Sequence, residues 1–382
     1  MKKLCFVTTT SATLKSFVTE TAYELHRLHP DYKITFICDN DPEFAQNLPP
    51  FIHFYPIAMK RGISFGDIGS IFKMMSFFRS QSFDMVQYST PNASLYAAVA
   101  SKLAGIKCRL YCQWGIRYVG FTGFKRRIFK FFEKISCRFA TQINAVSRKN
   151  LEFAVNEGLY SKDKAVVIGN GGTIGVDLSQ YDLKNRHAWR EEKRRELGIE
   201  GQTVFGFVGR LTSDKGTREL LSAVKHLSET ENIVLVCVGK CEIQDPGLFK
   251  LYEWASKSKN VIFTGPKEKS EVCKYYAVMD VYVHPTYREG FGMVLQEAGA
   301  MECAVITTDI PGAGEVFENN VSCLLAKAGD TESLTECMKK LLDNVELRQQ
   351  IGAAARKRVE ERYCREDMLR NQMARYEKLL QE

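Results

Sequence analysis

Short apolar runs alternate with longer amphipathic stretches along the first half of the chain. Short apolar runs bounded by polar residues are typical of buried strands, and apolar residues at helical spacing between them predict helices that cover a sheet. The predicted strands are Leu4–Thr8, Lys33–Asp39, His53–Ile57, Asp84–Tyr88, Arg109–Gln113, Gln142–Val146 and Ala165–Gly169. The predicted helices are Phe17–His29, Ile68–Arg79, Ala93–Ala104, Phe124–Ala140 and Arg148–Glu157. This alternation predicts a parallel sheet covered on both faces.

A second alternation begins at Val204 and predicts a second α/β domain. Its predicted strands are Val204–Val208, Ile233–Val238, Val261–Thr264, Val281–Val283 and Ala304–Thr307. The last predicted helices are Thr331–Leu342, Glu346–Arg362 and Arg365–Leu380. Between the alternations lie a glycine-rich run, Gly169–Gly175, and a charge-dense span, Asp182–Gly201. We interpret the span as an inter-domain connection with an exposed helix, and the glycine run as either a hinge or a phosphate cradle.

At 382 residues the chain is long for one core, so two domains are expected. We place an N-terminal domain at 1–185 and a second domain at 186–362. A final helix, 363–382, follows them. The fold class is therefore α/β, with two doubly wound Rossmann-like sheets that face a central cleft.

Composition excludes several classes of protein. Hydrophobic residues make up 45% of the chain and charged residues 26%, as in ordinary globular proteins, and no apolar run is long enough for a transmembrane helix. The first residues indicate a buried strand rather than a signal peptide. Twelve cysteines without metal-like spacing favour reduced thiols in a cytoplasmic protein. The stretch Thr8–Lys15 lacks Gly-x-Gly-x-x-Gly, which argues against an NAD enzyme.

The net charge of +8 is unevenly distributed. Residues 101–150 hold 12 Lys and Arg against one acidic residue, which indicates an anionic partner near the first domain. Within the predicted helix 124–139, one face carries Phe124, Ile128, Phe131, Ile135 and Phe139, and the other carries Lys125, Arg126, Lys130, Lys134 and Arg138. The aromatic face can simply pack on the sheet, with the charges solvated. The basic face favours an anionic membrane surface or a lipid diphosphate. Nucleic acid is a weaker alternative, since no nucleic-acid-binding motif accompanies the charge.

The stretch Tyr287–Met301 follows a predicted strand and spans a loop and a helix start. Glu289 stands in the loop with Gly290 and Gly292, where the backbone can approach a ligand closely. Free N–H groups at the helix start favour an anion, whereas Glu289 and Glu297 favour sugar hydroxyls. This combination describes a nucleotide sugar. The alternative is that the acidic residues only favour the helix N-terminus.

A second loop adds two cations at the same sheet edge. Gly209-Arg210 follows a predicted strand, and Lys215-Gly216 precedes a helix. Arg offers a planar fork to phosphate oxygens, and Lys offers a mobile point charge. The alternative is a pair of solvated loop cations.

Together these motifs, Gly-Arg-x-x-x-x-Lys-Gly and Glu289-Gly-Phe-Gly-x-x-x-x-Glu297, resemble those of the family 4 retaining glycosyltransferases of GT-B fold. The resemblance covers nearly the whole chain and is strongest to the branch that makes bacterial capsule, exopolysaccharide and O-antigen repeat units. It includes Ala145-Val-Ser147 and Val305–Gly312.

The resemblance implies roles for individual residues. Arg210 and Lys215 would hold the donor diphosphate, Glu289 would meet the transferred sugar, and Glu297 would bind the ribose. The other donor-binding positions are Gly209, Gly290, Phe291, Gly292 and Met293. The final helix would cross back onto the first domain.

The first domain departs from the family pattern at one position. Relatives have His-Gly where this chain has Trp114-Gly115, and an indole N–H can only donate. This raises altered donor preference, weak activity or a role for Gln113. Thr10 and Ser11, after the first strand, are further acceptor-side candidates.

The expected activity is a metal-independent, retaining transfer of a hexose or N-acetylhexosamine from a nucleoside-diphosphate sugar (UDP favoured) to a lipid-linked saccharide. The protein would be cytoplasmic and peripherally attached to the inner face of the cell membrane. Asp39-Asn-Asp41 spells the D-x-D signature of metal-dependent transferases but follows a strand of a different architecture, so no metal is expected. The alternatives are a catalytically silent nucleotide-sugar-binding protein and a GT-B epimerase or phosphorylase.

Overall fold

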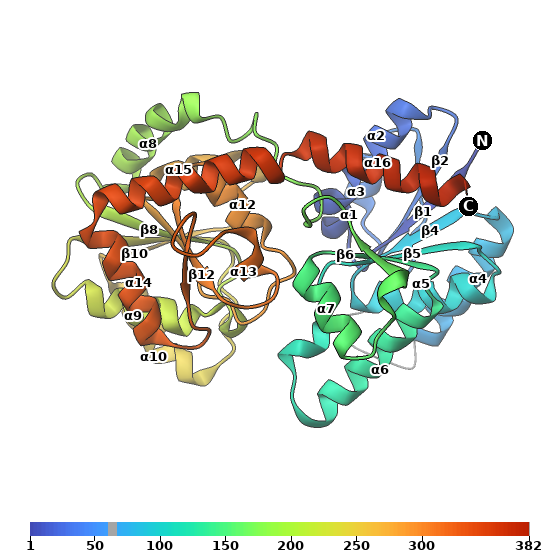
Figure 1. The fold of residues 1–382 in the computed structure, drawn as a ribbon, viewed down its shortest axis with the longest axis horizontal. Helices are drawn as coiled ribbons and strands as arrows, with labels where there is room; N and C mark the ends of the chain where they lie inside the picture. Colours follow the sequence, from blue (N-terminus) through green and yellow to red (C-terminus); the bar gives the residue numbers. More distant parts are fainter. Residues whose placement is uncertain (60–66, 382) are drawn as a thin grey trace. The chain divides into compact units, whose positions relative to one another are not determined.

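The computed structural model describes residues 1–59 and 67–381, which form two compact units (Figure 1). The first unit comprises residues 1–174 and 366–382, and the second comprises residues 175–365. The chain therefore enters the second unit between Ile174 and Gly175, earlier than the expected boundary at 185. It returns to the first unit at Glu366, close to the expected start of the final helix at 363.

The sheet of the first unit has seven parallel strands in the order β3-β2-β1-β4-β5-β6-β7. They are β1 (Lys3–Val7), β2 (Lys33–Ile37), β3 (Ile52–Phe54), β4 (Met85–Tyr88), β5 (Cys108–Gln113), β6 (Gln142–Ala145) and β7 (Ala165–Val167). Every predicted strand of this unit is thus confirmed, with small changes at the ends. Along the chain, β2 and β3 extend the sheet on one side of β1, and β4 then pairs with the other side of β1. The position between β1 and β4 is therefore the topological switch point of a doubly wound sheet.

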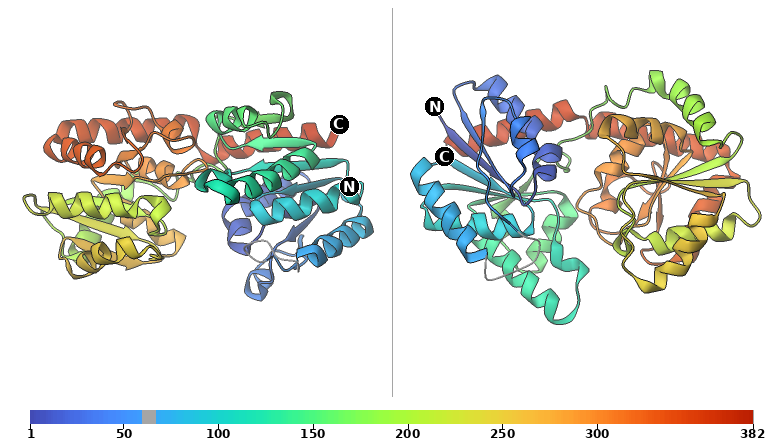
Figure 2. Two further views of the ribbon diagram at one scale, coloured as in Figure 1. Left: turned by 90° about the horizontal axis from the view of Figure 1, so that it is seen from below. Right: turned by 180° about the vertical axis from the view of Figure 1, so that it is seen from behind.

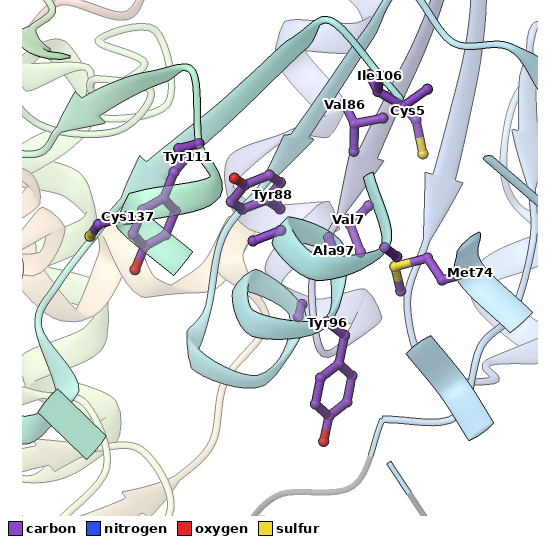
Figure 3. Close-up of a cluster of buried hydrophobic side chains, with 14 of the residues drawn as sticks. Cys5, Val7, Met74, Val86, Tyr88, Tyr96, Ala97, Ile106, Tyr111 and Cys137 are labelled. Atoms are coloured by element: carbon purple, nitrogen blue, oxygen red, sulfur yellow. The ribbon is translucent and has the colours of Figure 1, made fainter. Parts of the chain in front are cut away.

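Helices cover both faces of this sheet. On one face lie α4 (Asp67–Gln81), α5 (Pro91–Leu103), α6 (Gly123–Phe139) and α7 (Arg148–Asn156), and on the other lie α1 (Ser11–Phe17), α2 (Thr19–Leu28) and α16 (Arg365–Gln381). A short helix, α3 (Pro42–Gln46), follows β2. Alternate residues of β1 serve the two cores. Cys5 and Val7 join the cluster under α4 and α5 (Figure 3), whereas Leu4 and Phe6 join the cluster under α1, α2 and α16.

The last helix, α16, completes the second of these two cores. Met373, Tyr376 and Leu379 are buried in it, and the Tyr376 ring meets Phe6 of β1 edge-on. The Tyr376 hydroxyl donates to the Gln87 side chain of β4 over 2.6 Å. The C-terminal helix is therefore an integral part of the first unit.

The second unit contains a six-stranded parallel sheet in the order β10-β9-β8-β11-β12-β13. The strands are β8 (Thr203–Val208), β9 (Ile233–Val238), β10 (Val261–Gly265), β11 (Val281–His284), β12 (Ala304–Thr308) and β13 (Leu324–Ala326). One face carries α9 (Thr217–Leu227), α10 (Pro246–Lys257) and α14 (Thr331–Asp343). The other carries α8 (Leu183–Leu197), α11 (Lys269–Val278), α12 (Met293–Ala300) and α15 (Val345–Arg362), as Figure 1 and the right-hand view of Figure 2 show. A short helix, α13 (Ala313–Val316), follows β12.

The charged span 182–201 forms the predicted helix, α8, but its interpretation as an inter-domain connection is wrong. Arg190 and Arg194 both pair with Asp280, which precedes β11, and the Arg194–Asp280 distance is 2.7 Å. The Asp280 carboxylate also accepts from the backbone N–H of Val204. Because these charges are satisfied inside the second unit, α8 belongs to it.

Candidate functional site

The carboxyl ends of β8 and β11 lie side by side in the second sheet, so the loops after them share one edge. The loop after β8 carries Arg210, ends in a 3₁₀ turn at Ser213–Lys215 and enters α9 through Gly216. The loop after β11 carries Glu289 and enters α12 through Gly292. Both motifs predicted from the sequence are therefore at the same edge, as expected.

Lys215 and Glu289 form a partly buried ion pair. The Lys215 ammonium lies 2.6 Å from Oε2 of Glu289, and each side chain is only 19% exposed. The same carboxylate oxygen lies 3.1 Å from Nε2 of His284, the last residue of β11. Its other oxygen, Oε1, accepts the backbone N–H of Gly290 over 3.0 Å. The carboxylate is thus held from several sides.

The charge state of the Glu289 carboxyl follows from its surroundings. Burial opposes the charge on Glu289, but the Lys215 charge and the hydrogen bonds from His284 and Lys215 hold the pKa of its carboxyl well below the usual range. Burial lowers the pKa of His284, although Glu289 works in the opposite direction. At neutral pH Glu289 is therefore a carboxylate and His284 an uncharged imidazole.

Arg210 points to a different partner. Its guanidinium donates to the carboxylate of Glu242, in the loop after β9, over 2.9 Å. Lys240 lies 3.4 Å from the same carboxylate. The Arg210 side chain is 54% exposed, so this pair lies at the surface of the site.

Glycines let these loops approach backbone to backbone. A Cβ on Gly216 would lie 1.9 Å from the carbonyl oxygen of Pro285, which follows β11. A Cβ on Gly239, after β9, would lie 2.0 Å from the carbonyl oxygen of Gly209, and one on Gly312, after β12, would lie 2.4 Å from that of Gly290. The loops after four adjacent strands are therefore packed into one layer that only glycine permits at these points.

The start of α12 matches the prediction in outline. Gly292 takes a left-handed conformation (φ 73°) as N-cap without a side-chain cap, and Met293 is the first helical residue. Phe291 is buried against Tyr363 and contributes backbone rather than an exposed ring. Helix N-termini with free N–H groups attract anions, so α12 and the uncapped start of α9 can both face phosphate.

Glu297 lies in α12, one turn beyond these N–H groups. Its carboxylate accepts the hydroxyl of Tyr276 over 3.1 Å. Burial raises the pKa of Glu297, against the opposing effects of the Lys269 charge and the Tyr276 hydrogen bond. A partly buried carboxylate with a shifted pKa is suited to a neutral hydroxyl partner.

Sequence reasoning missed three residues of this site. His284 and Glu242 contact Glu289 and Arg210, as described. Asp214 accepts from the Nε of Arg288 over 3.0 Å and so joins the two loops. A polar residue at the end of an apolar strand is the signal that marks His284, whereas nothing local marks Glu242.

In the first unit, Trp114 and the Thr10–Ser11 pair follow β5 and β1. Trp114 is partly buried and packs on Phe17, with ring centroids 5.2 Å apart. Thr10 is the N-cap residue of α1, and Ser11 Oγ donates to the Asp41 carboxylate over 2.5 Å. Asp41 also caps α3 by accepting from Phe44 N–H, so its carboxylate is engaged within the fold.

Gln113, by contrast, lies inside the first unit and is fully buried. Its amide nitrogen donates to Glu133 of α6 over 2.6 Å, and its oxygen accepts the hydroxyl of Tyr160 over 2.8 Å. Tyr111 donates to the same Glu133 oxygen over 2.8 Å. The amide of Gln113, the residue considered for the role of the family's histidine, is thus engaged with Glu133 and Tyr160 inside the unit.

The hydrogen bonds of Glu133 to Tyr111 and Gln113 determine which side of α6 is buried. Glu133, Ser136 and Cys137 form its buried side, which the sequence had assigned to the aromatic stripe. The glutamate can face the interior because Tyr111 and Gln113 satisfy it, and Phe124 and Phe131 are consequently 76% and 61% exposed. Lys125, Arg127, Lys134 and Arg138 are exposed near them.

Arg126 and Lys130 of the same helix are paired instead. They lie 3.1 Å and 2.8 Å from the carboxylate of Glu157. The exposed side of α6 is thus both aromatic and basic, which differs from the expected separation into an aromatic and a basic face.

Among residues 1–59 and 67–381, no helix is long and apolar enough to cross a membrane. No group of three or more His, Cys, Asp or Glu side chains in the same residues is arranged to hold a metal ion.

Comparisons with known proteins agree with this picture of the second unit. The family model of glycosyl transferases group 1 matches residues 189–358. The chain is 33% identical over 309 residues to the capsular polysaccharide biosynthesis glycosyltransferase CapM of Staphylococcus aureus, covering 80% of each protein. It is 27% identical over 286 residues to the N,N'-diacetylbacillosaminyl-diphospho-undecaprenol alpha-1,3-N-acetylgalactosaminyltransferase of Campylobacter jejuni, covering 73% of each. The crystal structure of HepE from Anabaena in complex with UDP superposes with a TM-score of 0.77 at 18% identity, covering 99% of this chain and 100% of that one.

Proposed function

Because this chain belongs to the group 1 glycosyl transferases and has the GT-B fold, we propose that it transfers a hexose or N-acetylhexosamine from a UDP-sugar to a lipid-linked saccharide in surface polysaccharide synthesis. The names of its relatives support each part. The Staphylococcus protein is a capsular polysaccharide enzyme, and the Campylobacter protein acts on a diphospho-undecaprenol-linked sugar. HepE was crystallised with UDP.

The observation that carries the proposal is the Lys215–Glu289 pair at the sheet edge that also holds Arg210. An ammonium and a guanidinium suit a diphosphate, and a carboxylate suits sugar hydroxyls. The N-termini of α9 and α12 lie in the same two loops and add N–H donors. In the proposed complex, Arg210 and Lys215 bind the diphosphate, Glu289 binds the sugar and Glu297 binds the ribose. The backbone of Gly209 and of residues 290–293 lies beside them.

The same groups account for catalysis. Breaking the sugar C1–O bond places negative charge on the departing UDP, and pre-positioned cations and N–H groups stabilise that charge without rearrangement. Each charge-assisted contact contributes roughly 1.5–3 kcal/mol. We propose that Arg210 and Lys215 replace a divalent metal in this role. We also propose that the acceptor hydroxyl attacks from the face that UDP leaves, as in the family 4 retaining enzymes.

The exposed side of α6 supports a place for the acceptor at a membrane. Phe124 and Phe131 can enter the interface between headgroups and acyl chains, and the basic residues around them can meet anionic headgroups. A lipid-linked acceptor is confined to that surface. We propose peripheral attachment of the first unit through α6, on the cytoplasmic face.

A donor screen followed by product analysis tests the proposal. Thermal-shift measurements with UDP- and GDP-sugars identify the donor, which is then incubated with undecaprenyl-diphosphate-linked N-acetylhexosamine. We expect transfer that persists in EDTA and gives a product with the anomeric configuration of the donor. Loss of turnover in EDTA with recovery in manganese contradicts the metal-free role, and an inverted product contradicts retention. Binding of the donor without transfer to any acceptor favours a silent nucleotide-sugar-binding protein.

A further inference from the structure

His284 occupies the last position of β11 and is 1% exposed. Its ring lies nearly parallel to that of Phe207, with centroids 5.9 Å apart. One ring nitrogen, Nε2, lies 3.1 Å from Glu289, and the other, Nδ1, lies 3.4 Å from the hydroxyl of Tyr282. The imidazole is therefore fixed at both ends and on one face.

These contacts define which nitrogen carries the proton. The Glu289 carboxylate can only accept, so Nε2 of His284 must be the N–H that donates to it. Nδ1 is then unprotonated. The single hydroxyl proton of Tyr282 is donated to the Val208 carbonyl oxygen over 3.3 Å and is shared with Nδ1, which lies 3.4 Å from the same hydroxyl. Burial lowers the pKa of His284, which favours this uncharged form.

One carboxylate oxygen of Glu289 accepts two hydrogen bonds. Oε2 accepts from both Lys215 and His284, and Oε1 accepts one bond from Gly290. A carboxylate oxygen can accept two hydrogen bonds, so Oε1 retains capacity for a sugar hydroxyl. A diphosphate that attracts Lys215 would remove the shorter of the two bonds to Oε2.

We propose that His284 is a positioning residue that holds Glu289 toward the donor sugar when Lys215 turns to the diphosphate. Being buried and uncharged, the imidazole cannot follow Lys215 to the phosphates. It keeps one oxygen of Glu289 anchored and directs the other to the sugar. This inference rests on the proposed function, since it assumes that a UDP-sugar occupies the site.

The test compares affinities for UDP and for a UDP-sugar, measured by calorimetry. UDP lacks the group that Glu289 would bind, so the ratio of the two affinities reports on the sugar contact alone. The probe is whichever of UDP-glucose, UDP-galactose and their N-acetylhexosamine analogues wild type binds most tightly. The variants are His284→Leu, which removes the N–H group that donates to Glu289, and His284→Gln, whose amide N–H can replace that group.

We expect His284→Leu to bind UDP within about twofold of wild type but to lose roughly tenfold in affinity for the UDP-sugar, the scale of one hydrogen bond to a charged group. His284→Gln should restore most of that loss. His226→Gln, at an exposed histidine of α9, is the matched control and should change neither affinity.

Two results overturn the inference. One is a His284→Leu protein that keeps the wild-type affinity for the UDP-sugar. The other is a His284→Leu protein that loses affinity for UDP and the UDP-sugar equally, which would indicate a general structural role. A wild-type protein that binds neither UDP nor any UDP-sugar instead overturns the proposed function, so the two failures are distinguishable.

A measurement on wild type keeps the inference testable if His284→Leu does not fold. Nitrogen-15 NMR of labelled histidine distinguishes the two neutral tautomers and the charged ring. We expect the His284 signal to show a protonated Nε2 and a bare Nδ1, with and without UDP. A charged ring or the opposite tautomer overturns the inference.

Discussion

Arg210 donates to Glu242 over 2.9 Å and so joins the loop after β8 to the loop after β9. Lys215, the second cation of the same loop, pairs with Glu289. Both cations assigned to the diphosphate thus pair with carboxylates of neighbouring loops. If they bind the diphosphate as proposed, donor binding is an exchange of anions, and the carboxylates set its affinity.

Glu242→Gln should therefore tighten UDP binding by about two- to fivefold, because the exposed Arg210–Glu242 ion pair is weak and has to break before Arg210 binds the diphosphate. Isothermal calorimetry with UDP measures the change. Glu253→Gln, which breaks the exposed Glu253–Lys257 pair on α10, is the control and should leave the affinity unchanged. Unchanged or weaker binding in Glu242→Gln would contradict the exchange.

Arg210→Ala and Lys215→Ala should each reduce sugar transfer at least about a hundredfold, the scale of losing one transition-state donor. Their effects on stability should differ. Lys215→Ala removes the cation beside a partly buried carboxylate and should lower the free energy of unfolding by about 1–3 kcal/mol. Arg210→Ala removes an exposed partner and should change it by less than about 0.5 kcal/mol. Near-native turnover in either variant would indicate that the diphosphate binds elsewhere.

Gly216→Ala should destabilise the protein more than Gly265→Ala. Both glycines have φ close to 70°, so both alanines bear the same backbone strain. Only the Gly216 Cβ meets an atom, the carbonyl oxygen of Pro285 at 1.9 Å, whereas nothing lies within 4 Å of a Cβ on Gly265. We expect an additional loss of about 1–3 kcal/mol for Gly216→Ala in urea unfolding. Equal losses would show that the β8 and β11 loops separate easily.

Glu133→Gln should stabilise the first unit at neutral pH. Burial raises the pKa of Glu133 above its ordinary value of 4.5, so the folded protein binds this proton more tightly than the unfolded chain. The resulting stability is fully present below the ordinary pKa and is lost as the pH rises through the folded-state pKa. Glutamine keeps an acceptor for Tyr111 and Gln113 without the charge.

Melting temperatures from about pH 4 to about pH 8 check this prediction. The advantage of Glu133→Gln should be greatest at the alkaline end and vanish at the acidic end. Glu152→Gln, at an exposed position of α7, should show no such trend. An advantage that grows toward acid pH would contradict the sign.

Replacing Phe124 and Phe131 of α6 by serine should abolish flotation with liposomes that contain anionic lipid. Replacing Lys125, Arg127, Lys134 and Arg138 by glutamine should weaken flotation and remove its salt dependence, since each cation near the surface contributes about 1 kcal/mol. Phe249→Ser removes a ring of α10 that is 50% exposed and serves as the control. Wild-type protein that does not float at any salt concentration would remove the membrane proposal.

Periodicity predicted the strands well because each is a short apolar run in a fully covered sheet. It missed α1 and α3. The first has a single buried residue, Leu14, which is too few to show a helical period, and the second is a single capped turn. The span 182–201 looked like a connection because its charges appear unpaired until Asp280, far along the chain, is placed beside Arg190 and Arg194.

The candidate site, like the fold, could be predicted only in part from the sequence. Local motifs predicted Arg210, Lys215 and Glu289 as site residues, because glycine and charge within one loop carry that signal, and the structure places their two loops at one sheet edge. They did not show that Arg210 binds Glu242, since that contact depends on the order of β8 and β9 in the sheet. The buried position of Gln113 depends on how α6 is rotated about its axis, which a list of aromatic positions does not determine.

The contribution of α16 to the first unit has a consequence for protein synthesis. On the ribosome, residues 1–174 emerge first, yet the helix that buries Phe6 and its neighbours is made only after all of residues 175–365. The second unit can fold as a contiguous segment, whereas one apolar face of the first unit stays exposed until α16 is synthesised. We therefore expect a chain truncated before Glu366 to contain a folded second unit and an incompletely folded first unit that aggregates or binds chaperones.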